Sequence, residues 1–183
     1  MSLLEAQTMP QGTQAPDFTL KDTDGGMKSL ADFIDKKGVL IAFTCNHCPY
    51  AKAAWPLLIQ LHDYYKNSIH FVGINPNDAE TYPDDSYDAM KEKKKEWRIP
   101  FPYLYDESQE AAHAYNAQCT PDLYLFNTDS TAKLYYHGRI NDNWQHPDMV
   151  KEHNLKDALE SLINGEAAPN NQPPSMGCSI KWK

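Results

Sequence analysis

Two cysteines, Cys45 and Cys48, separated by Asn46 and His47, are the residues of this sequence best placed to do chemistry. Two thiols at this spacing can ligate a metal ion, exchange electrons as a dithiol and a disulfide, or fill space in a core. In a redox pair, one thiolate attacks a disulfide to form a mixed disulfide, and the second thiol resolves it. We expect Cys45 to be the attacking thiol and Cys48 the resolving thiol.

The elements around this pair favour redox chemistry. Residues 39–43 form an unbroken apolar run, which predicts a strand buried on both faces. Apolar residues then recur at helical spacing from Pro49 to Tyr65, so a helix follows the pair directly. The start of a helix stabilises a thiolate through its N–H groups and its macrodipole, and we expect Cys45 to benefit. Because α/β folds place their sites where strands end and helices begin, two inert buried thiols are a poor interpretation.

A metal site at this pair would need more ligands than the sequence places there. A tetrahedral zinc ion takes four ligands, so one CxxC supplies half of a site. The remaining cysteines, Cys119 and Cys178, do not form a second pair, and His47 lies inside the first one. Thiol-disulfide exchange is therefore the favoured chemistry, and we expect no metal or cofactor. The non-enzymatic alternative is a metal-binding module that uses the CxxC pair.

The two residues between the cysteines, Asn46 and His47, are expected to tune the redox balance. Any group that stabilises the reduced thiolate makes the corresponding disulfide a stronger oxidant. Histidine changes its charge near neutral pH, so a protonated His47 would act in this direction. The alternative is that His47 is a solvent-exposed loop residue without such a role.

Composition and charge restrict the class of protein. The chain has 183 residues, 41% of them hydrophobic, which suits one globular domain with a sizeable core. The net charge of -8 and the presence of only two arginines, Arg98 and Arg139, argue against nucleic acid and anionic membranes as partners. The sequence has no apolar run long enough to span a bilayer and no pattern of a secretory signal, so the cytoplasm is the expected compartment.

The rest of the chain predicts strands that alternate with helices and end in a hairpin. This order is typical of the α/β class, with a mixed sheet and helices on both faces. We expect an N-terminal arm at residues 1–15, loosely held because it is polar, one domain at residues 16–165, and an extended proline-containing tail at residues 166–183. Further strands are predicted at residues 69–74, 100–105, 123–126 and 133–137, and further helices at residues 87–97, 108–115 and 148–163.

A Thr-Pro pair, Thr120-Pro121, precedes the strand predicted at residues 123–126. This order of elements resembles the thioredoxin fold: a strand, the CxxC pair, a helix and a later Thr-Pro. In that fold a cis-proline loop faces the dithiol and offers its backbone to a substrate chain. The opening Ala15-Pro16-Asp17-Phe18 and the additional strand and helix before Thr120 are similar to the redoxin branch of that fold, the alkyl hydroperoxide reductase and thiol-specific antioxidant superfamily.

The resemblance implies a thiol-disulfide oxidoreductase of cell redox homeostasis or antioxidant defence, with Cys45 and Cys48 opposite a cis-Pro121. Its implied partners are a disulfide-containing protein or small thiol as substrate, and a thioredoxin or glutathione system as reductant. The predicted strand at residues 39–43 lacks the buried carboxylate that thioredoxins use as a proton relay. A carboxylate from residues 78–85, or His47, would have to serve instead.

A thiol peroxidase is the alternative activity within the same superfamily. Peroxiredoxins carry a threonine three residues before the peroxidatic cysteine and an arginine near the cis-proline. If Cys48 takes the peroxidatic place, Cys45 stands where that threonine would be, and Cys119-Thr120 where the arginine would be. Without these groups to bind and polarise a peroxide, fast peroxidase chemistry is disfavoured.

The last cysteine, Cys178, lies in the tail, where Ile180 and Trp182 alternate with polar residues. This alternation predicts an edge strand, or packing of two apolar side chains, that docks Cys178 near the dithiol. A docked Cys178 would be an accessory redox thiol, able to exchange with Cys45 or to pair with Cys119. The alternative is a disordered tail with a stray thiol.

Overall fold

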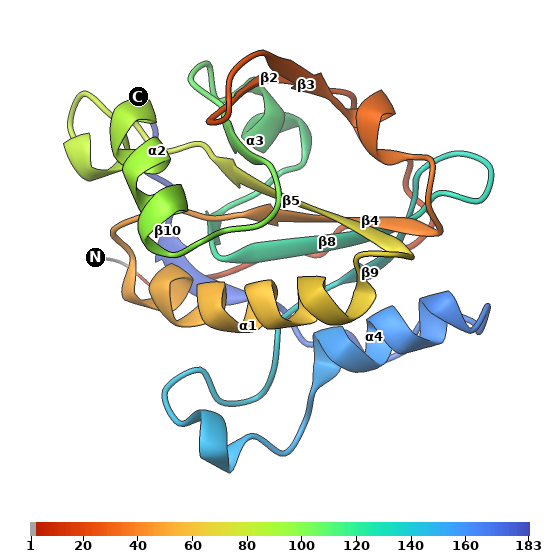
Figure 1. The fold of residues 1–183 in the computed structure, drawn as a ribbon. Coiled ribbons are helices and arrows are strands. Elements are labelled where there is room, and N and C mark those ends of the chain that lie inside the picture. Colours follow the sequence, from red (N-terminus) through yellow and green to blue (C-terminus); the bar gives the residue numbers. More distant parts are fainter. Residues whose placement is uncertain (1–2) are drawn as a thin grey trace.

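Residues 3–183, which the computed structural model describes, fold around a seven-stranded mixed sheet of order β3-β2-β6-β5-β4-β8-β9 (Figure 1). Strands β4, β5 and β6 are parallel, and β8 runs antiparallel to β4. The strands of this sheet are β2 Thr19–Asp22, β3 Met27–Ser29, β4 Gly38–Phe43, β5 Ile69–Asn75, β6 Tyr103–Tyr105, β8 Asp122–Asn127 and β9 Lys133–His137.

Helices cover both faces of this sheet, as the alternation of elements predicts. Helices α1 (Pro49–Tyr65) and α4 (Asn154–Ile163) lie on one side, and α3 (Glu110–Ala114) lies on the other (Figure 1). Helix α2 (Tyr87–Glu96) contributes Met90 to the same core as α1 and α4. Short 3-10 helices occur at η1 Leu30–Phe33, η2 Pro83–Asp85 and η3 Pro147–Met149.

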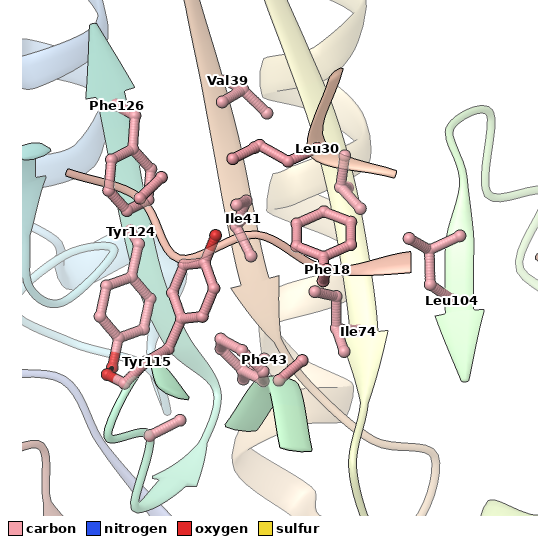
Figure 2. Close-up of a cluster of buried hydrophobic side chains, with 14 of the residues drawn as sticks. Phe18, Leu30, Val39, Ile41, Phe43, Ile74, Leu104, Tyr115, Tyr124 and Phe126 are labelled. Atoms are coloured by element: carbon pink, nitrogen blue, oxygen red, sulfur yellow. Dashed lines mark hydrogen bonds between the residues drawn. The ribbon is translucent and has the colours of Figure 1, made fainter. Parts of the chain in front are cut away.

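Strand β4 separates the two cores and ends at the cysteine pair. Its side chains alternate, so that Val39, Ile41 and Phe43 enter one core, which Figure 2 shows, while Leu40 and Ala42 enter the other. Each fully buried large apolar side chain stabilises the fold by about 1.5–3 kcal/mol. The apolar run at residues 39–43 is therefore a central strand with both faces covered, and it fixes the position at which the chain leaves the sheet.

A second sheet, of order β1-β10-β7 within the described residues, joins both ends of the chain to the site. Strand β10 (Met176–Ser179) pairs antiparallel with β1 (Leu3–Glu5) on one side and with β7 (Cys119–Thr120) on the other. The polar N-terminal residues predicted no strand. Leu3 and Leu4 are exposed, so backbone pairing with β10, and not burial, orders this segment.

The last helix is shorter than its apolar spacing predicts. It begins at Asn154, not near Asp148, because residues 147–149 form a separate 3-10 turn and Val150 is extended. Leu155 and Leu159 are buried as expected. Among the described residues, no helix combines the length and apolar character that crossing a membrane requires.

Candidate active site

The cysteine pair lies in the connection between β4 and α1. Cys45 and Cys48 are both 0% exposed, and they form a small buried cluster with Ala51 and Cys178, against which Tyr50 packs. A substrate can therefore reach the sulfur atoms only after neighbouring side chains move.

Cys48, and not Cys45, lies at the N-terminus of helix α1. The helix begins at Pro49, as its spacing predicts, and Cys48 is the N-cap residue in an extended conformation. Cys45 lies three residues earlier, so the prediction that the helix start stabilises the Cys45 thiolate is wrong. The stabilising N–H groups act on Cys48, whose thiolate accepts a hydrogen bond from the backbone of Ala51.

Three cysteine sulfurs and the Thr120-Pro121 loop converge at this point. The Thr120-Pro121 peptide bond is cis, as the resemblance implies. Thr120 contacts both sulfurs of the pair: its Oγ1 lies 3.3 Å from Cys45 Sγ, and its carbonyl oxygen lies 3.4 Å from Cys48 Sγ. The sulfur of Cys178 lies 2.7 Å from that of Cys48.

The four cysteines do not share one environment. The expected docking of Cys178 on the site is confirmed, but its sulfur contacts Cys48, whereas the sequence suggested exchange with Cys45 or pairing with Cys119. Cys119 Sγ donates a hydrogen bond to the carbonyl of Pro121 at 3.8 Å, and Cys119 lies outside the buried cluster of the other three.

The surroundings lower the pKa of Cys48 and raise the pKa values of Cys45 and Cys178. A hydrogen bond from Cys45 outweighs the effect of burial and, with further hydrogen bonds from Cys178 and Ala51, lowers the pKa of Cys48 to about 5. Burial raises the pKa of Cys45 well above its usual range, and burial followed by the hydrogen bond to Cys48 raises that of Cys178 to about 12. These shifts favour the thiolate at Cys48 over one at Cys45 or Cys178.

A buried carboxylate, Asp85, organises the residues between the cysteines. Its two oxygens accept hydrogen bonds from the backbone of Asn46 (2.7 Å), from Asn77 Nδ2 (2.8 Å) and from Asn75 Nδ2 (3.2 Å), and contact His47 Nδ1 at 2.5 Å. Burial opposes ionisation of Asp85, but the hydrogen bonds of His47, Asn77 and Asn46 prevail and lower its pKa.

His47 is held by Asp85 and is not a solvent-exposed loop residue. Its side chain is 14% exposed, and its ring stacks on that of Tyr82 with centroids 5.4 Å apart. The hydrogen bond to Asp85 raises the pKa of His47, which places a positive charge next to the cysteine pair over a wider pH range.

The sequence indicates Asp85 only as one of several carboxylates in residues 78–85. It does not indicate the side chains that hold the segment between β4 and α1 in place. Tyr103 donates a hydrogen bond to Asn46 Oδ1 at 2.9 Å, and the Trp55 indole donates one to the carbonyl of Cys45 at 3.3 Å. Trp55 and Tyr103 are large polar-tipped aromatics in predicted elements, which is a signal for a buried partner but not for its identity.

Among residues 3–183, a group of side chains with ligand atoms for a metal is formed by Cys45, His47 and Asp85, whose ligand atoms lie within 4.8 Å of one another. Metal binding requires a deprotonated cysteine and a histidine nitrogen with an available lone pair. Here burial raises the pKa of Cys45, which opposes its deprotonation, and His47 Nδ1 and the Asp85 carboxylate are already bonded to each other. A metal ion would have to break that hydrogen bond.

Known sequences and solved structures resemble this chain over most of its length. The sequence profile of the AhpC/TSA family matches residues 11–135. The chain belongs to the AhpC/TSA family. A solved structure of an uncharacterized conserved protein from Geobacillus kaustophilus is 43% identical, covers 100% of this chain and 97% of that chain, and superposes with a TM-score of 0.94.

Two further similar proteins carry names that indicate activity. The thiol-disulfide oxidoreductase ResA of Bacillus subtilis is 23% identical over 144 residues, which are 78% of this chain and 76% of ResA. The thioredoxin domain of a thiol-disulfide oxidoreductase from Bacteroides vulgatus is 17% identical, covers 86% of this chain and 98% of that domain, and has a TM-score of 0.60. The AhpC/TSA chain described here therefore has the thioredoxin-like α/β fold.

Proposed function

We propose that this chain is a thiol-disulfide oxidoreductase of the thioredoxin type, with Cys45 and Cys48 as its redox pair beside the Thr120-Pro121 loop. The observation that carries the proposal is the geometry of the pair: Cys48 is the N-cap of α1, and both Cys48 and Cys45 contact Thr120 of the cis-proline loop. The lowered pKa of Cys48 agrees with this arrangement. A stabilised thiolate next to a second thiol is what attack and resolution require. The name of the relative ResA supports the same activity.

Thiol-disulfide exchange at this pair begins with Cys48. Its thiolate attacks one sulfur of a substrate disulfide, so that a Cys48-substrate disulfide forms and the first substrate thiolate leaves. Cys45 then loses its proton and attacks the Cys48 sulfur, which releases the second substrate thiolate and leaves a Cys45-Cys48 disulfide. This order reverses the roles expected from the sequence, because the helix start stabilises the charge on Cys48.

The groups around the pair have separate tasks in this scheme. The Thr120 hydroxyl, 3.3 Å from Cys45 Sγ, lowers the pKa of Cys45 against the effect of burial and so eases its deprotonation. The imidazole of His47, held by Asp85, stabilises the thiolate state of Cys48 by its charge. Asn46, whose backbone and side chain are both hydrogen-bonded, fixes the loop.

The partners proposed for this enzyme follow from its chemistry. The substrate is a disulfide-containing protein or a small-molecule disulfide, and a thioredoxin or glutathione system in the cytoplasm restores the dithiol. Because the cysteines are 0% exposed, the substrate must displace the side chains that cover them.

Reduction of insulin, or of a glutathione mixed disulfide, by the wild-type chain and by Cys45→Ser and Cys48→Ser tests the proposal. Cys48→Ser should abolish turnover because it removes the attacking thiolate. Cys45→Ser should lower turnover because it removes a resolving thiol and the main hydrogen bond to Cys48. Equal rates for all three proteins would refute the proposal.

A thiol peroxidase is the second candidate, and the position of Cys48 favours it. A thiolate at a helix N-cap with a pKa of about 5 would also attack a peroxide. The arginine that peroxiredoxins use is missing at Cys119-Thr120, and Arg139 is hydrogen-bonded to Asn154 and Glu152. Rapid, sustained hydrogen peroxide consumption by the wild-type chain, lost in Cys48→Ser, would place this activity first.

A further inference from the structure

The C-terminal strand β10 brings the sulfur of Cys178 to Cys48. Cys178 is paired with Thr120, and Ser179 with Cys119, in the antiparallel register of β10 and β7. The strand passes beside the N-terminal end of α1 (Figure 1), and its cysteine side chain joins the buried cluster of the redox pair. The distance of 2.7 Å between the Cys48 and Cys178 sulfurs therefore follows from backbone pairing.

Gly177 allows this close approach. A Cβ atom at residue 177 would lie 2.1 Å from the carbonyl oxygen and 2.6 Å from the carbonyl carbon of Thr120. Backbone atoms cannot yield to such a contact as a flexible side chain can, so any larger residue would push β10 away from the loop. Glycine at position 177 keeps the neighbouring Cys178 within reach of Cys48.

The chain beyond Cys178 is fixed to the domain at several points. The backbone N–H of Lys181 donates to Asn77 Oδ1 at 2.9 Å, and its carbonyl accepts from Gln109 Nε2 at 2.8 Å. The ring of Trp182 stacks on His113 with centroids 4.2 Å apart. Asn77 also donates to Asp85, so one side chain joins the tail to the carboxylate that holds His47.

We propose that Cys178 is a second resolving thiol and that a Cys48-Cys178 disulfide is a working oxidised form of the enzyme. The inference rests on the proposed thiol-disulfide exchange. After Cys48 has formed a disulfide with a substrate sulfur, Cys178 gives up its proton and its sulfur attacks Cys48. The Cys48-substrate bond breaks, the substrate leaves as a thiol that takes up a proton, and two protein thiols have supplied the two electrons.

The same contact allows Cys178 to act after Cys45. When Cys45 and Cys48 are joined, the Cys178 sulfur can attack Cys48 and release Cys45 as a thiol, with no net change in oxidation state. Cys45 and Cys178 thus compete for one central sulfur. An oxidised chain therefore holds a mixture of two disulfides that share Cys48.

Treatment of Cys45→Ser with oxidised glutathione, followed by alkylation and mass spectrometry of non-reduced peptides, tests the proposal. Cys45→Ser should form the Cys48-Cys178 disulfide and lose the glutathione adduct. Cys45→Ser with Cys178→Ser should retain one glutathione on Cys48. Cys45→Ser with Cys119→Ser is the matched control, and it should behave as Cys45→Ser does because Cys119 bonds to Pro121.

A stable glutathione adduct on Cys48 in Cys45→Ser, with Cys178 alkylated, would overturn the role of Cys178 and leave the proposed function intact. Absence of an adduct on Cys48 in the Cys45→Ser, Cys178→Ser protein would instead contradict the proposed function. Adding Gly177→Ala to Cys45→Ser keeps every remaining thiol but displaces β10. The glutathione adduct should then return, and an unchanged Cys48-Cys178 disulfide would also count against the proposal.

Discussion

Replacing Asp85 with asparagine removes one charge at the centre of the network and changes little else in size. Both carboxylate oxygens accept hydrogen bonds, one from Asn46 and Asn75, the other from Asn77 and His47. In either orientation, the amide nitrogen of the new side chain would face two of these donors. Asp85→Asn therefore leaves buried donors without an acceptor and His47 without its counter-ion.

The size of the effect follows from this geometry. Because the Asp85 side chain is 0% exposed, solvent does not screen the interaction, and loss of one partner of a buried ion pair costs about 3–5 kcal/mol. For a chain of this length each kcal/mol lowers the melting temperature by about 2–4 °C. Asp85→Asn should therefore unfold about 6–20 °C below the wild-type protein near pH 6.

The loss should depend on pH in a defined direction. The pKa of His47 is raised above 6.5, so its contribution is complete below pH 6.5 and is lost as the pH rises through the folded-state value. The pKa of Asp85 is lowered below 3.8, so its contribution is complete above pH 3.8 and is lost at lower pH. The gap between wild type and Asp85→Asn should be widest from about pH 4 to 6.5 and smaller at pH 9.

Thermal unfolding followed by circular dichroism measures this gap. Asp84→Asn is the matched control, because its side chain is exposed and only its backbone carbonyl accepts a hydrogen bond from Asn46. The control should unfold within about 2 °C of wild type, since exposed substitutions change stability by no more than about 0.5 kcal/mol. If the melting temperature of Asp85→Asn lies within about 2 °C of the wild-type value at pH 6, a charged Asp85 does not stabilise this hydrogen-bond network.

Three further substitutions probe the thiols directly. The ultraviolet absorbance of the thiolate should titrate near pH 5 in the wild-type chain; Cys48→Ser should lose this transition, and a transition that survives would contradict the assignment. Thr120→Val should slow alkylation of Cys45 because it removes the hydroxyl that lowers the pKa of that thiol, and faster alkylation would contradict this. Gly177→Ala should raise the alkylation rates of Cys48 and Cys178 at least several-fold by displacing β10, whereas Met176→Ala, an exposed position on the same strand, should leave them unchanged.

Local sequence signals were sufficient for the central elements. The apolar run at residues 39–43 and the helical spacing from Pro49 to Tyr65 predict β4 and α1 because burial on both faces, or along one stripe, leaves a direct pattern in the sequence. The apolar spacing predicts a start of α4 that is too early, because a 3-10 turn at Pro147–Met149 and the extended Val150 after it interrupt a pattern that looks continuous. The spacing of apolar residues shows which side chains are buried, but not at which residue the backbone hydrogen bonds of the helix begin.

The sequence predicts which residues form the site, but not which atoms of these residues are in contact. Cys45, Cys48 and the cis Thr120-Pro121 bond were found from spacing and resemblance. Which thiol the helix start stabilises depends on the cap geometry, and the structure places Cys48, immediately before Pro49, at the N-cap. The alternation around Ile180 and Trp182 predicts that Cys178 docks on the site, but not that its sulfur contacts Cys48. The contacts of Asp85 join segments far apart in the chain and leave no local pattern.

Equilibration of the wild-type chain in glutathione buffers, from fully reducing to fully oxidising, tests the central claim most directly. Samples are quenched with acid, alkylated and mapped by mass spectrometry without reduction. We predict one disulfide per chain in the oxidising buffers, always including Cys48 and joined to Cys45 or Cys178, and no such transition in Cys48→Ser. Alkylated Cys48 in every buffer, or the same amount of internal disulfide in Cys48→Ser, would contradict thiol-disulfide exchange centred on Cys48.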